Sequence, residues 1–441
     1  MTESTPNLKV LIICYYWPPA GGPGVQRWLK FIKYLREFQV EPVVYIPKNP
    51  TYPLVDESLT REILQDLEII SQPIFEPFGL AKFFSKRQTQ NLSAGIIPVD
   101  RKQSLIQRAM LFVRGNFFIP DARKFWIQPS VKYLKDYLGE NNVDAIITTG
   151  PPHSLHMIGQ ALRSGIRIPW IADFRDPWTD IGYHQKLKLT KKSQVKHLKF
   201  EHAVLDTADK IIVTSPTTLA NFEAKTTTPI QCITNGFDVA HFPETPLSEK
   251  FTLSHIGSLL SGRNPLILWK VLSELKTENS DFVRDLELQL IGKVSSDILD
   301  TLNDFGLTEN LTLKGYISHD EVLIAQCSAQ ILLLIEIDSE ITKGIIPGKL
   351  FEYLAARRPI LGIGPEQADF FDIVKKTRSG KTFNHQDYYE LKRYLTNQYR
   401  KFKENGIPNT EGIIEQFTRK NLTGVLAETI RTIVEEFQAK T

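Results

Sequence analysis

The sequence has few cysteines, almost no net charge and no long apolar run. Its three cysteines, Cys14, Cys232 and Cys327, lie far apart and form no Cys-x-x-Cys pair. Neither a zinc site nor a disulfide framework is therefore supported, and we expect reduced, buried thiols. The formal net charge of +3 over 441 residues is too small to indicate a nucleic-acid partner. Since no run of about 18 apolar residues is present, no transmembrane helix is predicted.

Length and composition indicate a globular protein with two domains. A chain of 441 residues with 42% apolar and 23% charged residues is typical of soluble proteins, and each half can bury a full core. The N-terminal residues 1–7 are polar and unlike a signal peptide. We therefore expect a cytoplasmic protein.

The first half opens with a strand, a glycine turn, a helix and a second strand. Residues 9–15 are a continuous apolar run typical of a buried parallel strand, and a helix is predicted from Val25. Gly22 and Gly24 in the turn would let the backbone approach an anion closely. As a dinucleotide fingerprint the turn fails, because Arg27 stands where the third glycine belongs. A tight turn without a ligand remains the alternative.

The second half repeats this design. Residues 252–256 predict a strand, residues 257–265 form a glycine loop that contains Arg263, and a helix is predicted from Leu266. Arg263 is either an anion ligand or part of a surface turn. Further parallel strands alternate with helical segments, and they are predicted at residues 286–291, 311–314 and 331–335.

The stretch 344–363 reads as a loop, a helix and a strand. Pro347 and Gly348 disfavour a regular helix, the apolar spacing after Lys349 favours one, and residues 360–363 suit a buried strand. The positive end of the helix dipole does not favour a cation such as Lys349 at the start of a helix. An anion bound by both Lys349 and the free N–H groups would remove this unfavourable interaction. Glu352 lies one turn further on. The alternative is an ordinary surface lysine and glutamate.

Two polar elements in the first half come directly after predicted strands. After the strand predicted at 143–148, Ser154 is the predicted N-cap of a helix and places His156 in its first turn. After the strand at 169–172 come Asp173 and Arg175. The carboxyl edge of an open α/β sheet is where ligands bind, so these side chains are site candidates. A polar helix start and a local ion pair are the alternatives.

Three further segments complete the prediction. Residues 81–135 contain eleven cations, two acids and interleaved apolar side chains, which suits an anionic membrane surface or a solvated basic face packed on the domain. Residues 185–206 predict a long polar helix. Residues 412–439 have apolar side chains at helical spacing and predict a C-terminal helix.

The motifs together resemble the retaining glycosyltransferases of family four, and four of them agree in order and spacing. The stretch 347–359 is similar to the family's loop and helix that hold a sugar nucleotide. Residues 150–156 and 173–178 resemble the Gly-Pro-Pro-x-Ser-x-His and Asp-Phe-Arg-Asp-Pro-Trp elements of one subgroup. Two positions depart from the pattern: Gly344 stands where the first glutamate belongs, with Glu340 as a substitute, and Ser258 replaces an arginine.

The resemblance implies the GT-B fold, with two Rossmann-like α/β domains facing a central cleft. It implies an N-terminal acceptor domain at 1–244, a nucleotide-sugar domain at 245–410, and a helix at 411–441 that packs back on the first domain. It places His156 at the donor sugar and Glu352 on the ribose as the catalytic pair. The donor-binding residues it implies are Gly22, Gly24, Arg263, Pro347, Gly348 and Lys349, with Asp173 and Arg175 as further cleft residues.

The implied activity is transfer of a sugar from a nucleoside-diphosphate sugar to a glycan or lipid-linked acceptor, in cell-envelope polysaccharide synthesis. Neither a metal nor another cofactor is expected, because cations can stabilise the departing diphosphate. The protein would be cytoplasmic or peripheral on the inner face of the membrane. Two alternatives remain: a nucleotide-sugar isomerase on the same fold, and a non-catalytic nucleotide-sugar-binding protein.

Overall fold

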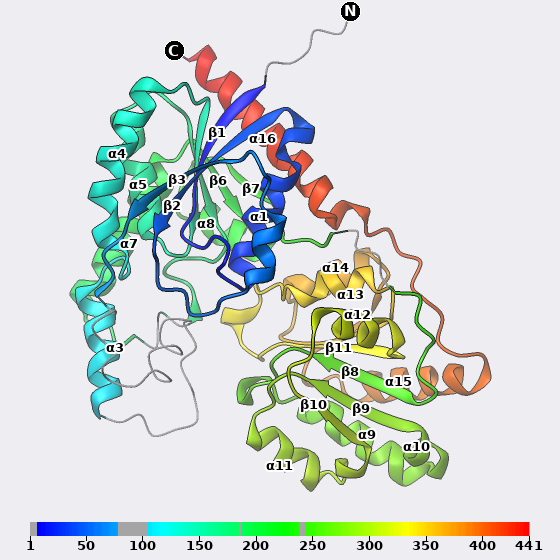
Figure 1. The fold of residues 1–441 in the computed structure, drawn as a ribbon. Coiled ribbons are helices and arrows are strands. Elements are labelled where there is room, and N and C mark those ends of the chain that lie inside the picture. The colour runs from blue at the N-terminus through cyan, green and yellow to red at the C-terminus, as the bar shows by residue number, and fades with distance from the viewer. Residues whose placement is uncertain (1–6, 78–104, 183, 185–186, 239–242, 441) are drawn as a thin grey trace, which may run out of the picture. The chain divides into compact units, whose positions relative to one another are not determined.

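The structure, a computed structural model, describes residues 7–77, 105–182, 184, 187–238 and 243–440 (Figure 1). The chain divides into two compact units. Unit 1 contains Met1–Asn235 and Arg419–Thr441, and unit 2 contains Gly236–Thr418. The sequence predicts the junctions at 244/245 and 410/411, whereas the units divide at 235/236 and 418/419.

Unit 1 is built on a seven-stranded sheet in which all neighbouring strands pair in parallel. Its spatial order is β3-β2-β1-β4-β5-β6-β7. The strands are β1 (Leu8–Ile13), β2 (Val40–Lys48), β3 (Glu68–Pro73), β4 (Ala145–Gly150), β5 (Trp170–Phe174), β6 (Lys210–Val213) and β7 (Ile230–Cys232). The helices of this unit include α1 (Pro23–Leu35), α3 (Leu105–Phe117), α4 (Ile127–Glu140), α5 (Ser154–Arg163), α7 (Lys191–Thr207), α8 (Pro216–Glu223) and α16 (Arg419–Ala439).

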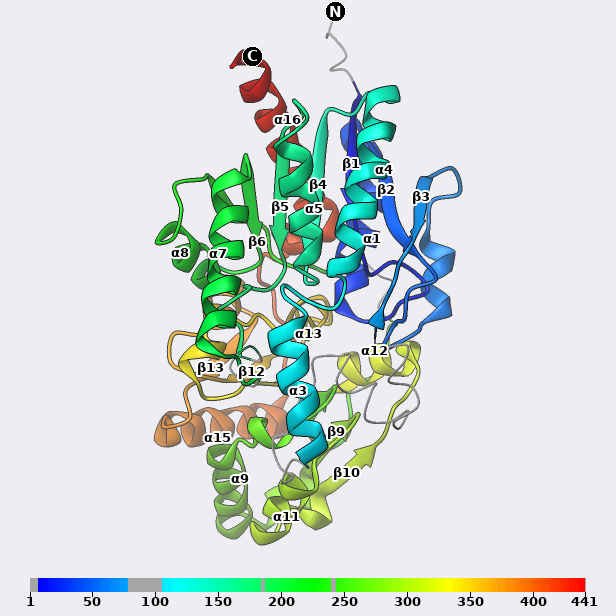
Figure 2. The same cartoon turned by 90° about the vertical axis from the view of Figure 1, so that its left-hand side faces the viewer.

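Alternate residues of the unit 1 strands face two separate cores. Val10 and Ile12 of β1 pack with α1 and α16, whereas Leu11 and Ile13 pack with α4, α5 and α7. Figures 1 and 2 show these two helical layers on opposite faces of the sheet. Because both faces are covered, the strands need apolar residues at successive positions, and this explains the continuous apolar run seen in the sequence.

Unit 2 repeats the same architecture with a six-stranded parallel sheet of order β10-β9-β8-β11-β12-β13. Its strands are β8 (Phe251–Ile256), β9 (Leu286–Ile291), β10 (Leu311–Lys314), β11 (Ile331–Ile335), β12 (Ile360–Ile363) and β13 (Gly380–Phe383). Its helices are α9 (Leu266–Glu278), α10 (Ser280–Asp285), α11 (Ser296–Asp304), α12 (His319–Ser328), α13 (Lys349–Ala355), α14 (Asp369–Lys376) and α15 (Tyr388–Glu404).

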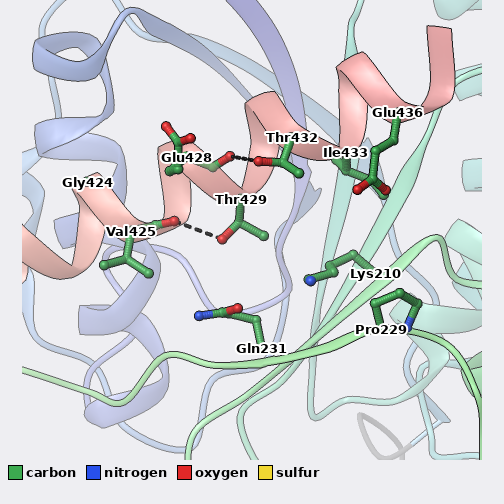
Figure 3. A pocket seen from close by; sticks show the side chains of 10 residues that line it. All are labelled: Lys210, Pro229, Gln231, Gly424, Val425, Glu428, Thr429, Thr432, Ile433 and Glu436. Carbon is green, nitrogen blue, oxygen red and sulfur yellow. Dashed lines mark hydrogen bonds between the residues drawn. The ribbon is translucent and has the colours of Figure 1, made fainter. Parts of the chain in front are cut away.

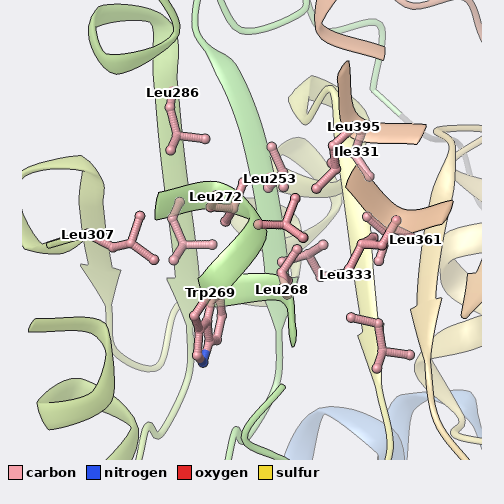
Figure 4. Close-up of a cluster of buried hydrophobic side chains, with 14 of the residues drawn as sticks. Leu253, Leu268, Trp269, Leu272, Leu286, Leu307, Ile331, Leu333, Leu361 and Leu395 are labelled. Atoms are coloured by element: carbon pink, nitrogen blue, oxygen red, sulfur yellow. The ribbon is translucent and has the colours of Figure 1, made fainter. Parts of the chain in front are cut away.

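The core of unit 2 also has two layers. One layer joins the sheet to α9, α10, α11 and α15, with Leu253, Leu272 and Leu333 completely buried (Figure 4). The other joins the sheet to α12, α13 and α14, with Leu332 and Leu354 completely buried. The prediction of two Rossmann-like α/β domains, each a parallel sheet between helical layers, is therefore confirmed.

The strands predicted at 286–291, 311–314, 331–335 and 360–363 agree with the structure, but two helices start later than expected. Helix α7 begins at Lys191 instead of 185, because Thr190 caps it by accepting a hydrogen bond from the Ser193 N–H (3.2 Å). Helix α16 begins at Arg419 instead of 412, since Ile414 packs into the core of unit 2 before the chain enters unit 1. Of the basic segment at 81–135, residues 81–104 lie outside the described residues.

Both sheets have the strand order in which the chain reverses its direction of winding between two central strands. That reversal lies between β1 and β4 in unit 1, and between β8 and β11 in unit 2. The crevice outside the carboxyl ends of such strands is the usual ligand position in open α/β sheets. The fold therefore directs attention to the residues just after these four strands.

Candidate functional site

Asp173, in β5, is the centre of a buried polar cluster in unit 1. Its carboxylate accepts hydrogen bonds from Arg27 Nη2 (3.0 Å), Trp28 Nε1 (2.7 Å) and Thr149 Oγ1 (2.9 Å). The side chains of Arg27 and Asp173 are 2% and 0% exposed. The cluster connects α1 to β4 and β5. The ion-pair partner of Asp173 is Arg27, which lies far along the chain, and not a local residue as the alternative from the sequence supposed.

Arg27 accounts for the incomplete dinucleotide fingerprint of the first glycine turn. It stands where the third glycine would be, and it also donates to the Thr234 carbonyl (3.0 Å) and to Asn235 Oδ1 (3.3 Å). Its guanidinium therefore binds Asp173 and the last residues of this part of unit 1 together. The sequence contained the signal for this residue, a cation replacing a glycine, but not its partner.

The glycine turn itself lies against Arg175. Gly22 is the N-cap of α1 with a φ of 97°, and Gly24 lies in the first turn of that helix. A Cβ atom at Gly24 would overlap Arg175 Nη1, so a larger residue there would displace this guanidinium. Arg175 also donates from Nη2 to the Pro151 carbonyl and from its N–H to the Gly150 carbonyl (3.0 Å). The structure thus brings together Gly24 and Arg175, both predicted, at the carboxyl edge of the sheet.

His156 is completely buried in the first turn of α5. Its ring stacks on Phe174 at 4.3 Å between centroids, and its Nδ1 lies 2.8 Å from Thr148 Oγ1. Burial lowers the pKa of His156 to about 3, so the imidazole is neutral at pH 7. His153, the weaker candidate, stacks on Trp178 at 4.7 Å, and burial holds its pKa well below the ordinary value.

The predicted N-cap of this helix was wrong by one position. His153 occupies the N-cap and makes no side-chain capping bond, and Ser154 is the first helical residue. The Ser154 hydroxyl instead donates to Asp121 Oδ1 (2.7 Å), and its N–H donates to Oδ2 of the same carboxylate (2.8 Å). A carboxylate from elsewhere in the chain therefore satisfies the helix start, a contact that local sequence rules cannot supply.

Lys349 forms the centre of the candidate site in unit 2. Its Nζ lies 2.9 Å from Nε2 of His255, near the end of β8. A Cβ added at Gly257 would lie 3.3 Å from Lys349 Nζ. The Tyr353 hydroxyl accepts a bond from the Ile256 N–H (3.0 Å) and so fixes α13 against β8. Gly257 has a φ of 109°, a conformation that favours glycine. This turn leaves the ammonium group at the crevice between β8 and β11.

Both members of the Lys349–His255 pair have lowered pKa values. Burial, and then the charge of Arg263, lowers the pKa of Lys349 to about 8. Burial, and then Lys349, holds the pKa of His255 well below its ordinary value, so His255 accepts a hydrogen bond as a neutral imidazole. The lysine is therefore a cation whose hydrogen-bond partner contributes no negative charge.

Arg263 is paired with an acid that the sequence prediction missed. Its Nη2 lies 3.0 Å from Glu336 Oε1, and the Glu336 side chain is 1% exposed. Glu336 comes directly after β11 and also accepts from the Ile337 N–H (2.9 Å). The sequence feature that could have identified Glu336 is its position directly after the apolar run 331–335, at the carboxyl end of a predicted strand. A diphosphate bound by Arg263 would have to share it with this carboxylate.

Glu352 lies in the first turn of α13 and is partly exposed. Its Oε2 accepts a bond from Gln326 Nε2 (3.1 Å) on α12, and Gln326 is completely buried. This contact orients the carboxylate and leaves Oε1 available. Gly348 is the N-cap of α13, and the Pro347 carbonyl accepts from the Leu350 N–H (2.9 Å), so the helical turn begins at Pro347.

Two cavities in the units lie away from these residues. One, of about 500 Å³, is lined by α16 and by residues at the amino ends of β6 and β7, including Lys210, Gln231 and Glu428 (Figure 3). The other, of about 680 Å³, is lined by Arg357 and Arg358, which precede β12. Both open at the amino ends of strands, whereas the candidate residues gather at the carboxyl ends. We therefore assign the candidate site to the carboxyl edges.

Metal binding and membrane crossing find no support in the described residues. Within those ranges, no group of three or more His, Cys, Asp or Glu side chains is arranged to hold a metal ion. No helix in the described part of the chain is long and apolar enough to cross a membrane.

Comparison with known proteins identifies the fold but does not identify the activity. No protein-family model and no curated protein matches the sequence. Among solved structures, the chain resembles the lipopolysaccharide outer core galactosyltransferase WaaB (13% identity, 96% of this chain and 99% of that one, TM-score 0.57). It also resembles HepE of Anabaena in complex with UDP-glucose (11% identity, 98% of this chain and 99% of that one, TM-score 0.53).

A third similar structure is a putative UDP-N-acetylglucosamine 2-epimerase from Listeria monocytogenes (12% identity, 98% and 97%, TM-score 0.53). At these identities the likeness shows the fold alone, which is GT-B, as predicted. The fold is shared by transferases and by an enzyme of another class, so the residues must decide the function.

The Asp173 cluster gives a prediction about stability. Asp173→Asn removes the only carboxylate charge that the described hydrogen bonds bring to Arg27 and leaves a buried cation without its counterion. We expect a loss of about 3–5 kcal/mol in the free energy of unfolding. Urea unfolding monitored by tryptophan fluorescence measures it, since five of the six tryptophans lie in unit 1.

The matched control is Asp66→Asn, which removes one partner of an exposed pair with Arg36. The Asp66 side chain is 79% exposed, so its unfolding midpoint should equal that of the parent protein. Equal midpoints for both variants would contradict the central role of Asp173.

Proposed function

We propose that the protein is a glycosyltransferase that moves a sugar from a nucleoside-diphosphate sugar to a glycan or lipid-linked acceptor. The reaction retains the anomeric configuration, needs no metal ion and serves cell-envelope polysaccharide synthesis. Unit 2 binds the nucleotide and unit 1 binds the acceptor. The solved structures of similar fold include a galactosyltransferase and a UDP-glucose complex, which supports this class of reaction.

The observation that carries the proposal is the environment of Lys349. Its ammonium group donates to a neutral imidazole and lies beside Gly257, where an added Cβ would lie 3.3 Å from the Lys349 nitrogen. It also lies at the crevice where Rossmann-like sheets bind ligands. Glu336 and Glu352 favour its charged form, but no carboxylate of the described residues forms an ion pair with it. A partly buried cation of this kind can bind an anion such as a diphosphate.

The chemistry of glycosyl transfer needs such a cation. The nucleoside diphosphate gains negative charge as it leaves, and a fixed cation stabilises that charge in the transition state. Lys349 is the principal group in this role, and Arg263 shares its charge between Glu336 and the diphosphate. Pro347 and Gly348 set the backbone before Lys349, and the proposal keeps for them the donor-binding role predicted from the sequence.

The proposal gives each remaining predicted residue a role within its own unit. Glu352 accepts hydrogen bonds from the two ribose hydroxyls, and Gln326 fixes its orientation. His156 contacts the donor sugar, and Gly22 and Gly24 allow close approach of a ligand at the carboxyl edge of β1. Arg175 stays available beside Gly24, whereas Asp173 acts through Arg27 and holds the edge in place.

Two other functions have a specific observation in their favour. The putative epimerase of similar fold supports a nucleotide-sugar isomerase, which consumes its substrate without an acceptor. Two substitutions support a protein that binds the nucleotide sugar without transferring it. Relative to the family-four pattern, Gly344 replaces a glutamate and Ser258 replaces an arginine. The three functions differ in the fate of the donor once it is bound.

The test is calorimetric titration of the purified protein with UDP, GDP, CDP, TDP and ADP in the presence of a chelator. Selective binding of one nucleotide supports a metal-independent donor site, and the sugar nucleotides of that base are then incubated with protein. Release of the nucleotide only with an acceptor supports transfer, conversion of the sugar alone supports the isomerase, and no change supports a binder. Absence of binding by every nucleotide contradicts the proposal.

Removing the Glu352 carboxylate should weaken nucleotide binding. Glu352→Ala loses the hydrogen bonds to the ribose, which we expect to cost about 1.5–3 kcal/mol of binding free energy. Titration with the selected nucleotide measures it. Glu309→Ala, at an exposed position just before the amino end of β10, is the control for a general change of charge. An unchanged dissociation constant in folded Glu352→Ala would remove this residue from the site.

The lowered pKa of Lys349 predicts a pH dependence of binding. The ammonium is charged below its pKa of about 8 and neutral above it, and a bound anion raises this pKa further. Affinity should therefore fall as the pH rises from 7 to 10. Loss of a charge-assisted bond corresponds to a weakening of roughly tenfold to hundredfold. The matched variant Lys349→Arg does not titrate in this range, so its affinity should stay level. A level profile in the parent protein would contradict the prediction.

We also propose that unit 1 binds an anionic membrane surface through the described part of the basic segment. Phe75, Phe117 and Phe125 are 61%, 63% and 42% exposed, and the rings of Phe75 and Phe125 lie 5.5 Å apart. Lys124 Nζ lies 5.1 Å from the Phe125 ring. Exposed aromatic rings beside a cation suit a lipid headgroup region, and a lipid-linked acceptor would be found there.

Acidic substitutions on this surface should release the protein from vesicles. The double variant Phe117→Glu/Phe125→Glu removes apolar area worth about 1.5–3 kcal/mol per ring if both rings insert. Co-sedimentation with vesicles containing phosphatidylglycerol measures the bound fraction. Ile413→Glu, at a 74% exposed position in unit 2, is the control and should bind like the parent protein. Equal binding by the double variant and the control would place the membrane contact elsewhere.

A further inference from the structure

The cavity of about 680 Å³ in unit 2 borders the segment that joins α13 to β12. Helix α13 ends at Ala355 and β12 begins at Ile360, and Arg357 and Arg358 between them line the cavity. The opposite end of α13 carries Lys349, so the cavity is separate from the candidate donor site. Its volume lies within the roughly 300–1,000 Å³ that is usual for small-molecule sites.

The Arg358 side chain is buried at the wall of this cavity and is held by neutral acceptors. Its Nε donates to the Ala329 carbonyl (2.7 Å), and its Nη1 donates to Asn409 Oδ1 (2.8 Å). Its Nη2 donates to the carbonyl of Gln330 (3.2 Å) and to the side-chain Oε1 of the same residue (3.4 Å). Because Arg358 is only 2% exposed, these contacts fix its position before any ligand arrives.

These contacts leave one N–H group of the guanidinium without an acceptor. A guanidinium has one N–H on Nε and two on each Nη. The described contacts use the N–H of Nε, one of Nη1 and both of Nη2, so the second N–H of Nη1 remains. Asn409, the partner of Nη1, itself lines the cavity. An acceptor on a ligand in the cavity would satisfy this donor.

The charge of Arg358 also has no counterion. Among the residues that the structure describes, no carboxylate forms an ion pair with it. Burial lowers the pKa of Arg358 to about 10, while the Cys327 thiol acts in the opposite direction, so the guanidinium is charged at neutral pH. Glu244 lines the cavity too, but it is exposed and makes no ion pair with Arg358. A buried cation is costly unless it is paired, so this environment favours an anion as ligand.

Arg357 adds a second cation to the lining, with contacts of its own. Its guanidinium donates to the Gly412 carbonyl and lies 3.5 Å from Glu415, whose side chain is 62% exposed. Its backbone has a φ of 57°, the left-handed conformation in which the residue after a helix end is usually glycine. The chain therefore has an arginine at the mouth of the cavity where a glycine would be less strained.

We propose that this cavity binds a small organic anion, whose phosphate or carboxylate group accepts a hydrogen bond from Arg358 Nη1. Leu247 and Ile407 also line the cavity, so the carbon skeleton of the ligand has apolar side chains to contact. The proposal goes beyond glycosyl transfer and does not depend on it. Phosphate and carboxylate share the oxygen geometry that a guanidinium binds, and separate probes distinguish them.

The experiment measures how fast N-ethylmaleimide modifies Cys327, a partly exposed residue of the cavity lining, in the full chain. Mass spectrometry of the peptides follows Cys327 and, as an internal reference, the partly exposed Cys232 of unit 1. Glycerol 3-phosphate and succinate are the phosphate and carboxylate probes, and uncharged glycerol is the control. When a probe exceeds its dissociation constant about tenfold, modification of Cys327 should slow about tenfold, because only the unoccupied cavity reacts.

Slowing of Cys327 by one of the two anions supports the proposal and assigns the phosphate or the carboxylate class, and slowing by both assigns their shared chemistry. Unchanged rates with both anions overturn the proposal, and so does a Cys327 that does not react even without a probe. An equal slowing of Cys232, or an equal effect of glycerol, shows a general change of reactivity and also overturns it.

Asn409→Asp tests whether the missing counterion is the reason for binding. The new carboxylate would lie beside Arg358 Nη1 and neutralise it, so the anions should no longer protect Cys327. The matched control is Asn397→Asp, the same change at an exposed position on α15, which should keep the protection seen in the parent protein. Protection that survives in Asn409→Asp overturns the role of Arg358.

Arg358→Met removes the guanidinium and keeps a side chain of similar length. Protection of Cys327 by the anions should disappear in this variant and persist in Arg393→Met, at an exposed position on α15. Equal protection in both variants contradicts the proposal. If Arg358→Met does not fold, Asn409→Asp still decides, because it keeps the oxygen that accepts from Arg358.

Discussion

The buried ion pair between Arg27 and Asp173 is the interaction on which the carboxyl edge of unit 1 depends. A carboxylate that accepts from an arginine, a tryptophan and a threonine fixes α1, β4 and β5 relative to one another. Buried charges are costly unless they are paired and fully hydrogen-bonded, so the pair tolerates little displacement of these elements. Arg175, Gly24 and His156 all belong to the carboxyl edge that this pair stabilises.

The buried charges of unit 2 are arranged differently from those of unit 1. In unit 2 Arg263 and Glu336 compensate each other, whereas Lys349 lies against a neutral histidine. Burial, and then the charge of Arg263, lowers the pKa of the lysine, while Glu336 and Glu352 act in the opposite direction. A bound anion would favour the charged form that burial disfavours. Unit 1 therefore pairs Arg27 with Asp173, whereas in unit 2 Lys349 is the cation that we propose binds the donor diphosphate.

The sequence predicted the fold better than the site. Buried parallel strands need continuous apolar runs, so residues 286–291 and 331–335 were found with their correct bounds. The start of α16 was missed because Ile414 packs in unit 2, a tertiary contact that periodicity does not reveal. Among site residues, Lys349 and Glu352 stood out by motif, but Glu336 and His255 act through neighbours far along the chain, and only the folded structure brings these together.

The path of the chain through the units has a consequence for synthesis on the ribosome. Unit 2 is an insertion between Asn235 and Arg419, so its last residue leaves the ribosome before unit 1 has received α16. Leu426 and Ile430 of that helix are buried against α1 and β1, and until they arrive this face of the first sheet stays exposed. Unit 2 can therefore fold during translation, whereas unit 1, although begun first, is completed only after α16 has emerged.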